Sequence, residues 1–247
     1  MNSDIVQTVA RNLQSVRQRI AAAAERAGRA PEEVRLVAVT KYVDLETVRA
    51  LLAAGQLDLG ESRVQQLVKR AEALGSADAE LLEPLPAEDR TPRWHMIGHL
   101  QRNKVRHLLT CCRIVHSLDS VRLANELEHQ AARTGRSVEV FIELNVAGEA
   151  TKSGAPVEEL PALAETVAGC DHLRLVGLMT MAPLVPDPEQ TRPCFARLRE
   201  LLDELHARSL AGRDCIHLSM GMSNDYEVAI EEGATVVRIG SALFAGL

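Results

Sequence analysis

The sequence predicts an α/β protein that folds as a single (β/α)8 barrel of the TIM type. Strand-like and helix-like segments alternate along the chain, eight segments have strand character, and 247 residues is the usual size of one such barrel. Alternation of this kind implies βαβ units and therefore a parallel sheet. Eight parallel strands close into a barrel rather than leave an open sheet.

The predicted strands are short apolar runs, and the segments between them carry apolar residues at helical spacing. The strands are residues 35–41, 57–60, 94–98, 114–118, 138–145, 173–181, 216–221 and 236–241. The helices between them are residues 45–54, 64–74, 121–134, 157–168, 193–207 and 226–232. One apolar face on each helix would pack against the outside of the barrel.

A further helix is predicted within residues 1–30. Its apolar residues recur at spacings of three and four, as Val6, Val9, Leu13, Val16 and Ile20. Asn2 or Ser3 can cap its start, and Gly28 ends it. Because no helical segment follows the last strand, we expect this helix to complete the outer ring of the barrel.

No linker, repeat or low-complexity tract divides the sequence, so residues 1–247 are predicted to form one domain. Residues 76–92 are rich in Asp, Glu and Pro and are predicted to be an exposed insertion loop.

Composition argues against several classes of function. The net charge is −6 and the pI is about 5.8, which argues against nucleic acid or an anionic membrane as the main partner. The N-terminal segment carries charges along its length, unlike a targeting signal. The five cysteines lack metal-binding spacing, so we expect no metal site and a reducing, cytoplasmic location.

Barrels of this kind place their sites at the C-terminal ends of the strands. Gly221 ends the seventh predicted strand and Ser223 follows it, and Gly240 and Ser241 end the eighth. Glycine lets backbone N–H groups approach an anion, and serine hydroxyls can donate further bonds. These four residues have the chemistry of a phosphate site. Small residues can also simply relieve crowding there, and both interpretations stay open.

Lys41 ends the first predicted strand, and Arg238 lies within the eighth. A strand-end lysine is usually solvated, but in a barrel mouth its desolvated amine is a good Schiff-base nucleophile. A lysine opposite a phosphate site indicates a phosphorylated aldehyde cofactor or a sugar-phosphate substrate. Arg238 only donates hydrogen bonds and so needs an acceptor. A buried carboxylate and an unprotonated pyridine nitrogen both satisfy it.

The histidines give weaker signals. His95 and His99 are four residues apart but do not share a helix, so no zinc motif is predicted. His217 is expected to be a packed residue within its strand. Asp119 is predicted to cap the helix that follows the fourth strand.

Several motifs occur together in the order typical of one protein family. They are LVAVTK at 36–41, LGES at 59–62, WHMIGHLQRNK at 94–104, KSG at 152–154, GLMTM at 177–181, LSMGMSNDYEVAI at 218–230 and VRIGSALFAG at 237–246. From about Val34 onward the chain resembles the pyridoxal phosphate homeostasis protein family (the YggS/PROSC type). It departs from that family at Ser62, where Asn is frequent.

The resemblance implies the barrel of alanine racemase, a type III fold of pyridoxal 5′-phosphate (PLP) proteins. It implies that PLP forms an internal aldimine with Lys41 and that Arg238 faces the pyridine nitrogen. Ser223, Gly240 and Ser241 would bind the phosphate, and Ser219 is a further candidate for cofactor binding.

The resemblance implies a protein that buffers PLP or delivers it to apoenzymes in vitamin B6 homeostasis. We expect this protein to be a monomer. The alternative is a small PLP-dependent amino-acid racemase, and a lysine-dependent aldolase fits the motifs less well. Racemisation needs a second acid or base opposite the lysine. We expect Tyr42, directly after the lysine on the strand, to point away from it, and Tyr226 begins a helix. We therefore expect no robust turnover and assign no catalytic residue.

Overall fold

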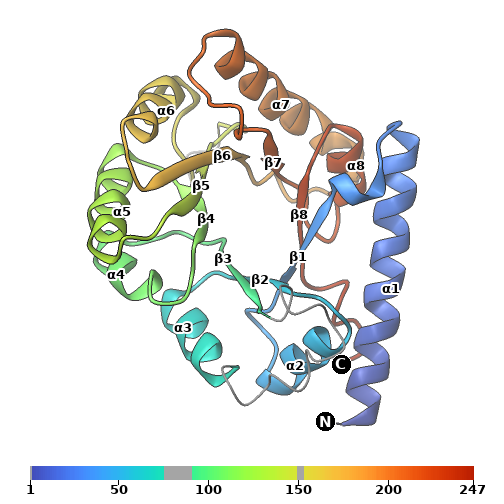
Figure 1. Cartoon of the computed structure of the whole chain (residues 1–247). Coiled ribbons are helices and arrows are strands. Elements are labelled where there is room, and N and C mark those ends of the chain that lie inside the picture. The colour runs from blue at the N-terminus through green and yellow to red at the C-terminus, as the bar shows by residue number, and fades with distance from the viewer. Residues whose placement is uncertain (1, 75–90, 149–152) are drawn as a thin grey trace.

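The computed structural model describes residues 2–74, 91–148 and 153–247. Eight strands form a closed barrel in which each strand pairs in parallel with the next, from β1 to β8. Pairing of β8 with β1, where Ala38 lies beside Ile239, closes the ring. The strands occupy the centre and the helices surround them (Figure 1). The (β/α)8 prediction is confirmed.

The strands lie where the apolar runs predicted them. They are β1 Arg35–Val39, β2 Asp58–Glu61, β3 Arg93–Met96, β4 Ile114–Leu118, β5 Val138–Glu143, β6 Leu173–Met179, β7 His217–Ser219 and β8 Val236–Ile239. Most end earlier than predicted. Lys41 thus lies two residues beyond β1, in a turn closed by a hydrogen bond from Val43 N to Thr40 O.

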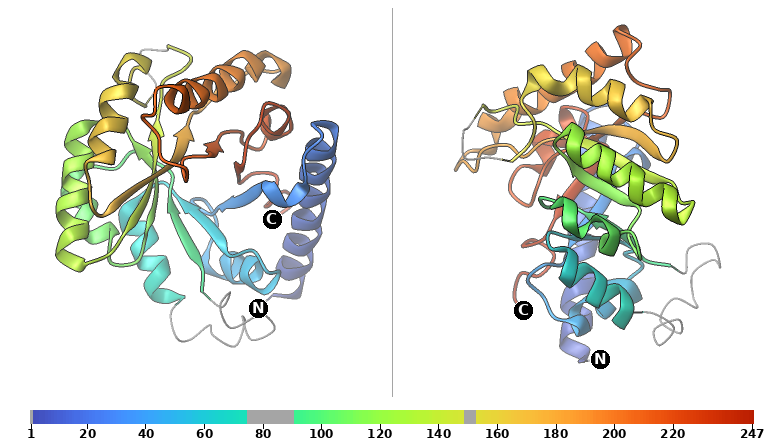
Figure 2. Two further views of the ribbon diagram at one scale, coloured as in Figure 1. Left: turned by 45° about the horizontal axis from the view of Figure 1, so that its top comes forward. Right: turned by 90° about the vertical axis from the view of Figure 1, so that its left-hand side faces the viewer.

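The helices form the outer layer, as two further views also show (Figure 2). They are α1 Ser3–Arg26, α2 Leu45–Ala53, α3 Val64–Ala73, α4 Val105–Leu108, α5 Val121–Thr134, α6 Leu160–Ala168, α7 Arg192–Ala207 and α8 Tyr226–Glu231. The prediction that Asp119 caps α5 was wrong. Ser120 is the N-cap, because its hydroxyl accepts from Leu123 N, while Asp119 pairs with His99.

Helix α1 completes the outer ring, as expected. It lies along α2 and α8 and buries Val9, Leu13 and Val16 on one face (Figure 1). The far end of the chain also contacts it, since the Asn12 amide donates to the carbonyl of Leu243. Helix α1 therefore fills the gap beside β8 and β1.

The core has two parts. A large apolar layer lies between strands and helices, and a smaller cluster fills the barrel interior. The interior cluster consists of Val37, Ile114, Phe141, Val176, Met179 and Val236. Buried polar side chains, among them His95, His116, Ser219 and Arg238, share this interior.

Other expectations can be compared directly with the structure. The predicted insertion at 76–92 lies outside the described residues except for its last two. The five cysteines are free thiols, and none of the described residues form a group of ligands suited to a metal ion. Within the same described ranges, no helix has the length and apolar character needed to cross a membrane.

Candidate functional site

The C-terminal ends of β1 and β8 lie side by side. Val37 pairs with Arg238, and a Cβ added to Gly240 would lie 3.3 Å from the carbonyl oxygen of Val39. Lys41 follows Val39 by two residues. The barrel therefore brings Lys41, Arg238 and Gly240 to the same end.

Lys41 is half-buried, and its Nζ lies 4.9 Å from the centre of the Tyr42 ring. Tyr42 itself is 89% exposed. The expectation that Tyr42 would lie on the strand and point away from the lysine was wrong. Both residues belong to the turn after β1, and the turn brings the ring beneath the amine.

Helix α3 holds this turn in place. Arg70 donates from Nη1 to the carbonyl of Thr40 at 2.6 Å and from Nη2 to the carbonyl of Val43. Gln66, one helical turn earlier, donates to the carbonyl of Lys41 at 3.2 Å. These three hydrogen bonds hold the backbone of the lysine-bearing turn against one helix. We call Arg70 and its partner Glu61 the turn clamp.

Glu61, the last residue of β2, anchors the clamp. Its Oε1 accepts from Thr40 Oγ1 at 2.6 Å and lies 2.5 Å from Arg70 Nη1. Its side chain is fully buried, and Oε2 has no hydrogen-bond partner among the described residues. Burial raises the pKa of Glu61, while Thr40, Arg70 and the nearby charge of Lys41 oppose the shift.

The phosphate candidates meet at the ends of β7 and β8. The hydroxyl oxygen of Ser223 accepts from Gly240 N at 3.2 Å and from Ala242 N at 3.4 Å. Two backbone N–H groups therefore converge on one oxygen, which is the arrangement that binds an anion. Ser241 lies between them and is exposed. These residues fit a phosphate group.

Gly221 makes this arrangement possible. Its φ is +91°, and a Cβ there would lie 2.6 Å from the Cβ of Ala229 and 2.9 Å from the Cα of Tyr226. The chain can reach Ser223 by this route only because the residue is glycine.

Arg238 is buried and hydrogen-bonds to two neutral groups. Its Nη1 donates to Ser219 Oγ at 2.6 Å and its Nη2 to the carbonyl of Thr180 at 3.0 Å. Burial lowers its pKa to about 10, although the charges of Glu143 and Asp225 oppose this. Within the described part of the chain no carboxylate lies within hydrogen-bonding distance of it. A guanidinium has five N–H donors, so Arg238 can donate to a further acceptor as well.

Ser219 lies deeper than the phosphate candidates. Its hydroxyl lies between Arg238 and His116, 2.8 Å from the Nδ1 of the latter, and has no exposed surface. Ser219 therefore has Arg238 and His116 as its side-chain partners. The sequence analysis did not single out His116, Glu61 or Arg70.

A signal for two of these residues was present. Arg70 follows Leu67 by three residues and precedes Leu74 by four, so it lies on the apolar stripe of α3. A charged residue in that position needs a buried partner. His116 likewise places an ionisable side chain in β4, a strand whose residues are all buried.

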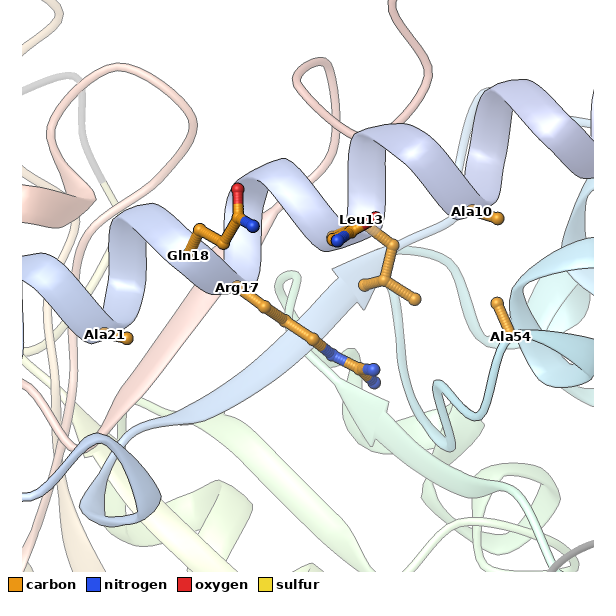
Figure 3. A pocket seen from close by; sticks show the side chains of 7 residues that line it. Ala10, Leu13, Arg17, Gln18, Ala21 and Ala54 are labelled. Carbon is orange, nitrogen blue, oxygen red and sulfur yellow. The ribbon is translucent and has the colours of Figure 1, made fainter.

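A surface hollow of the described chain lies elsewhere. A cavity of about 550 Å³ runs along α1 and is lined by Ala10, Leu13, Arg17 and Ala54 among others (Figure 3). The Arg17 guanidinium donates to the carbonyl of Gly55. This hollow contains neither a nucleophile nor an acid–base pair, so we do not place the site there.

Comparison with known proteins agrees with this geometry. Residues 11–247 match the family model of the alanine racemase N-terminal domain. A pyridoxal phosphate homeostasis protein of Pseudomonas aeruginosa is 44% identical over 96% of this chain and 95% of its own length. One from Aquifex aeolicus is 43% identical over 94% and 95%.

A solved structure points the same way. PipY of Synechococcus elongatus, crystallised with PLP bound, is 31% identical, with a TM-score of 0.79 over 96% of this chain and all of that one. The chain therefore belongs to the alanine racemase N-terminal domain family and, within it, to the pyridoxal phosphate homeostasis proteins.

Proposed function

We propose that this protein binds PLP covalently through Nζ of Lys41 and buffers the cofactor or delivers it to apoenzymes. One observation carries the proposal: the turn that holds Lys41 and the two backbone N–H groups that converge on Ser223 Oγ follow the neighbouring strands β1 and β8, at the same end of the barrel. An amine and an anion site at neighbouring strand ends suit a phosphorylated aldehyde. The names of the relatives and the PLP in PipY support it. We further propose that the protein is a monomer and that it is located in the cytoplasm.

Each residue has a separate task in this proposal. Ser223, Gly240 and Ser241 hold the phosphate, and Arg238 donates to the pyridine nitrogen. PLP, when bound, supplies an aldehyde carbon that an amine can attack. Arg238 would keep its proton, so the pyridine nitrogen of PLP would stay unprotonated. A neutral pyridine ring withdraws electrons less strongly than a pyridinium ring. Binding and release are therefore favoured over carbanion chemistry.

Replacement of Lys41 tests the point of attachment. We expect Lys41→Ala to abolish the visible absorbance of lysine-bound PLP, since the nucleophilic amine is lost. Borohydride reduction followed by peptide mapping of the wild-type protein should label the peptide that contains Lys41. Lys69→Ala, an exposed lysine on α3, is the control and should leave the spectrum unchanged. A label on another lysine would refute the assignment.

The racemase alternative needs an acid or base opposite Lys41. Tyr42, whose ring centre lies 4.9 Å from Lys41 Nζ, is the tyrosine to test for that role. We expect the PLP-loaded protein to show no robust exchange of the Cα proton of L-alanine or L-serine in deuterium oxide. Turnover of about 1 s⁻¹ or faster would support the racemase instead. Loss of that turnover in Tyr42→Phe would then identify Tyr42 as its acid–base group.

A further inference from the structure

A line of buried polar side chains crosses the barrel interior behind Arg238. From Arg238 Nη1 it passes to Ser219 Oγ at 2.6 Å, and from there to His116 Nδ1 at 2.8 Å. His116 Nε2 lies 2.9 Å from His95 Nδ1, and His95 Nε2 lies 2.9 Å from Asp58 Oδ1. We call Ser219, His116, His95 and Asp58 the interior relay.

The far end of the relay is anchored at the opposite end of the barrel. Arg93 at the start of β3 donates from Nε to Asp58 Oδ1 at 2.9 Å and from Nη2 to Oδ2 at 2.7 Å. Burial alone would raise the pKa of Asp58, but the bonds from Arg93 and His95 hold it below its ordinary value. Asp58 is therefore a carboxylate and can only accept hydrogen bonds.

This carboxylate determines the proton positions along the relay. His95 must donate to it from Nε2–H, and a neutral His95 then accepts at Nδ1. His116 must therefore donate from Nε2–H, and a neutral His116 accepts at Nδ1 from the hydroxyl of Ser219. The lone pairs of Ser219 are thereby left for Arg238, which is itself only a donor. Both ends of the relay require the same direction of donation.

The surroundings of both imidazoles favour the neutral form. Burial lowers the pKa of His95, against the opposing effect of Asp58. Burial lowers the pKa of His116 well below its ordinary value, and the charges of Arg238 and Arg35 add to this effect. His116 also stacks on Phe141, with ring centroids 4.3 Å apart, so its plane is held in one orientation.

We propose that the interior relay positions Arg238 for the ring nitrogen of the cofactor by presenting a Ser219 lone pair to its Nη1. With Nη2 on the carbonyl of Thr180, the guanidinium is held at two points. Its other donors remain for a further acceptor such as the ring nitrogen. The residues of the relay are positioning residues, since none of them needs to touch PLP. The inference rests on the proposed function for its ligand but on this chain alone for its geometry.

The first test uses the PLP-free, full-length protein. Long-range ¹H–¹⁵N spectra of histidine-labelled protein at neutral pH should show His95 and His116 as neutral Nε2–H tautomers. Assignments come from His95→Gln and His116→Gln. A cationic ring, or an Nδ1–H tautomer, at either position would overturn the direction of donation. Because no PLP is present, this result is independent of the proposed function.

The second test breaks the relay at His116. Phenylalanine keeps the stacking on Phe141 but neither accepts nor donates, so Ser219 is no longer oriented. We expect His116→Phe to bind PLP about tenfold more weakly, as for the loss of one buried hydrogen bond. We also expect the guanidinium proton resonances of Arg238 in the PLP-free protein to broaden through faster exchange.

Two variants serve as controls for that test. His116→Gln retains an acceptor towards Ser219 and a donor towards His95, so it should restore most of the affinity and the Arg238 resonances. Val176→Ala removes volume from the same interior without touching the relay. If His116→Phe matches Val176→Ala in PLP affinity and in the Arg238 resonances, the positioning role is refuted. If no variant binds PLP but the Arg238 resonances respond as expected, only the proposed function fails.

Discussion

Arg70→Met is expected to lower the free energy of unfolding by about 3–5 kcal/mol, because it leaves Glu61 as an unpaired buried charge. The carbonyls of Thr40 and Val43 lose their donor at the same time. Urea unfolding of the PLP-free protein measures the loss. The Lys41 turn loses its support, so PLP affinity should fall as well.

The loss should depend on pH in a defined direction. Without Arg70 the pKa of Glu61 in the folded variant rises further above 4.5, its ordinary value. A group whose pKa is raised by folding favours the folded state below that value and loses this effect as the pH rises. The gap between variant and wild type should therefore narrow as the pH approaches about 4.5. A constant gap would contradict the role assigned to Glu61.

Removal of both charges is the matched control for this prediction. The double variant Arg70→Met, Glu61→Leu should recover part of the stability, since no charge is then buried alone. It should not recover PLP affinity, because the turn still lacks its donor. A double variant no more stable than Arg70→Met would refute the clamp as a charge pair.

Gly177→Ala is expected to be the most destabilising small substitution, at about 4 kcal/mol or more. A Cβ at this position would lie 1.9 Å from the carbonyl oxygen of His217 and 2.6 Å from its carbonyl carbon. These are backbone atoms of the paired strand β7, so no rotamer change relieves the contact. The register shift between β5 and β6 at Phe141 occurs beside the same glycine.

Thermal unfolding followed by circular dichroism measures this effect. Gly169→Ala is the control, because its added Cβ would have no neighbour nearer than 3.6 Å and its backbone suits alanine. That variant should stay within about 0.5 kcal/mol of the wild type. Similar melting of the two variants would show that β6 and β7 can move apart.

Local pattern predicted much of the fold because apolar periodicity reports directly on which face of an element is buried. Strand β4 and helix α5 have the predicted bounds, and α1 lies where its apolar stripe required. The end of β1 could not be predicted in this way. Thr40 and Lys41 continue the apparent strand, but contacts with Glu61, Gln66 and Arg70 turn the backbone there.

The sequence by itself determined the barrel, because strand and helix segments alternate along the chain, and its family motifs gave Lys41, Arg238 and the phosphate candidates as expectations. The turn clamp and the interior relay were decided only by the tertiary structure. His116 and Ser219 are 103 residues apart, and His95 and Asp58 are 37 apart. Their side chains meet because closure of the barrel sets the register of β2, β3, β4, β7 and β8, and with it the side chains that share one interior.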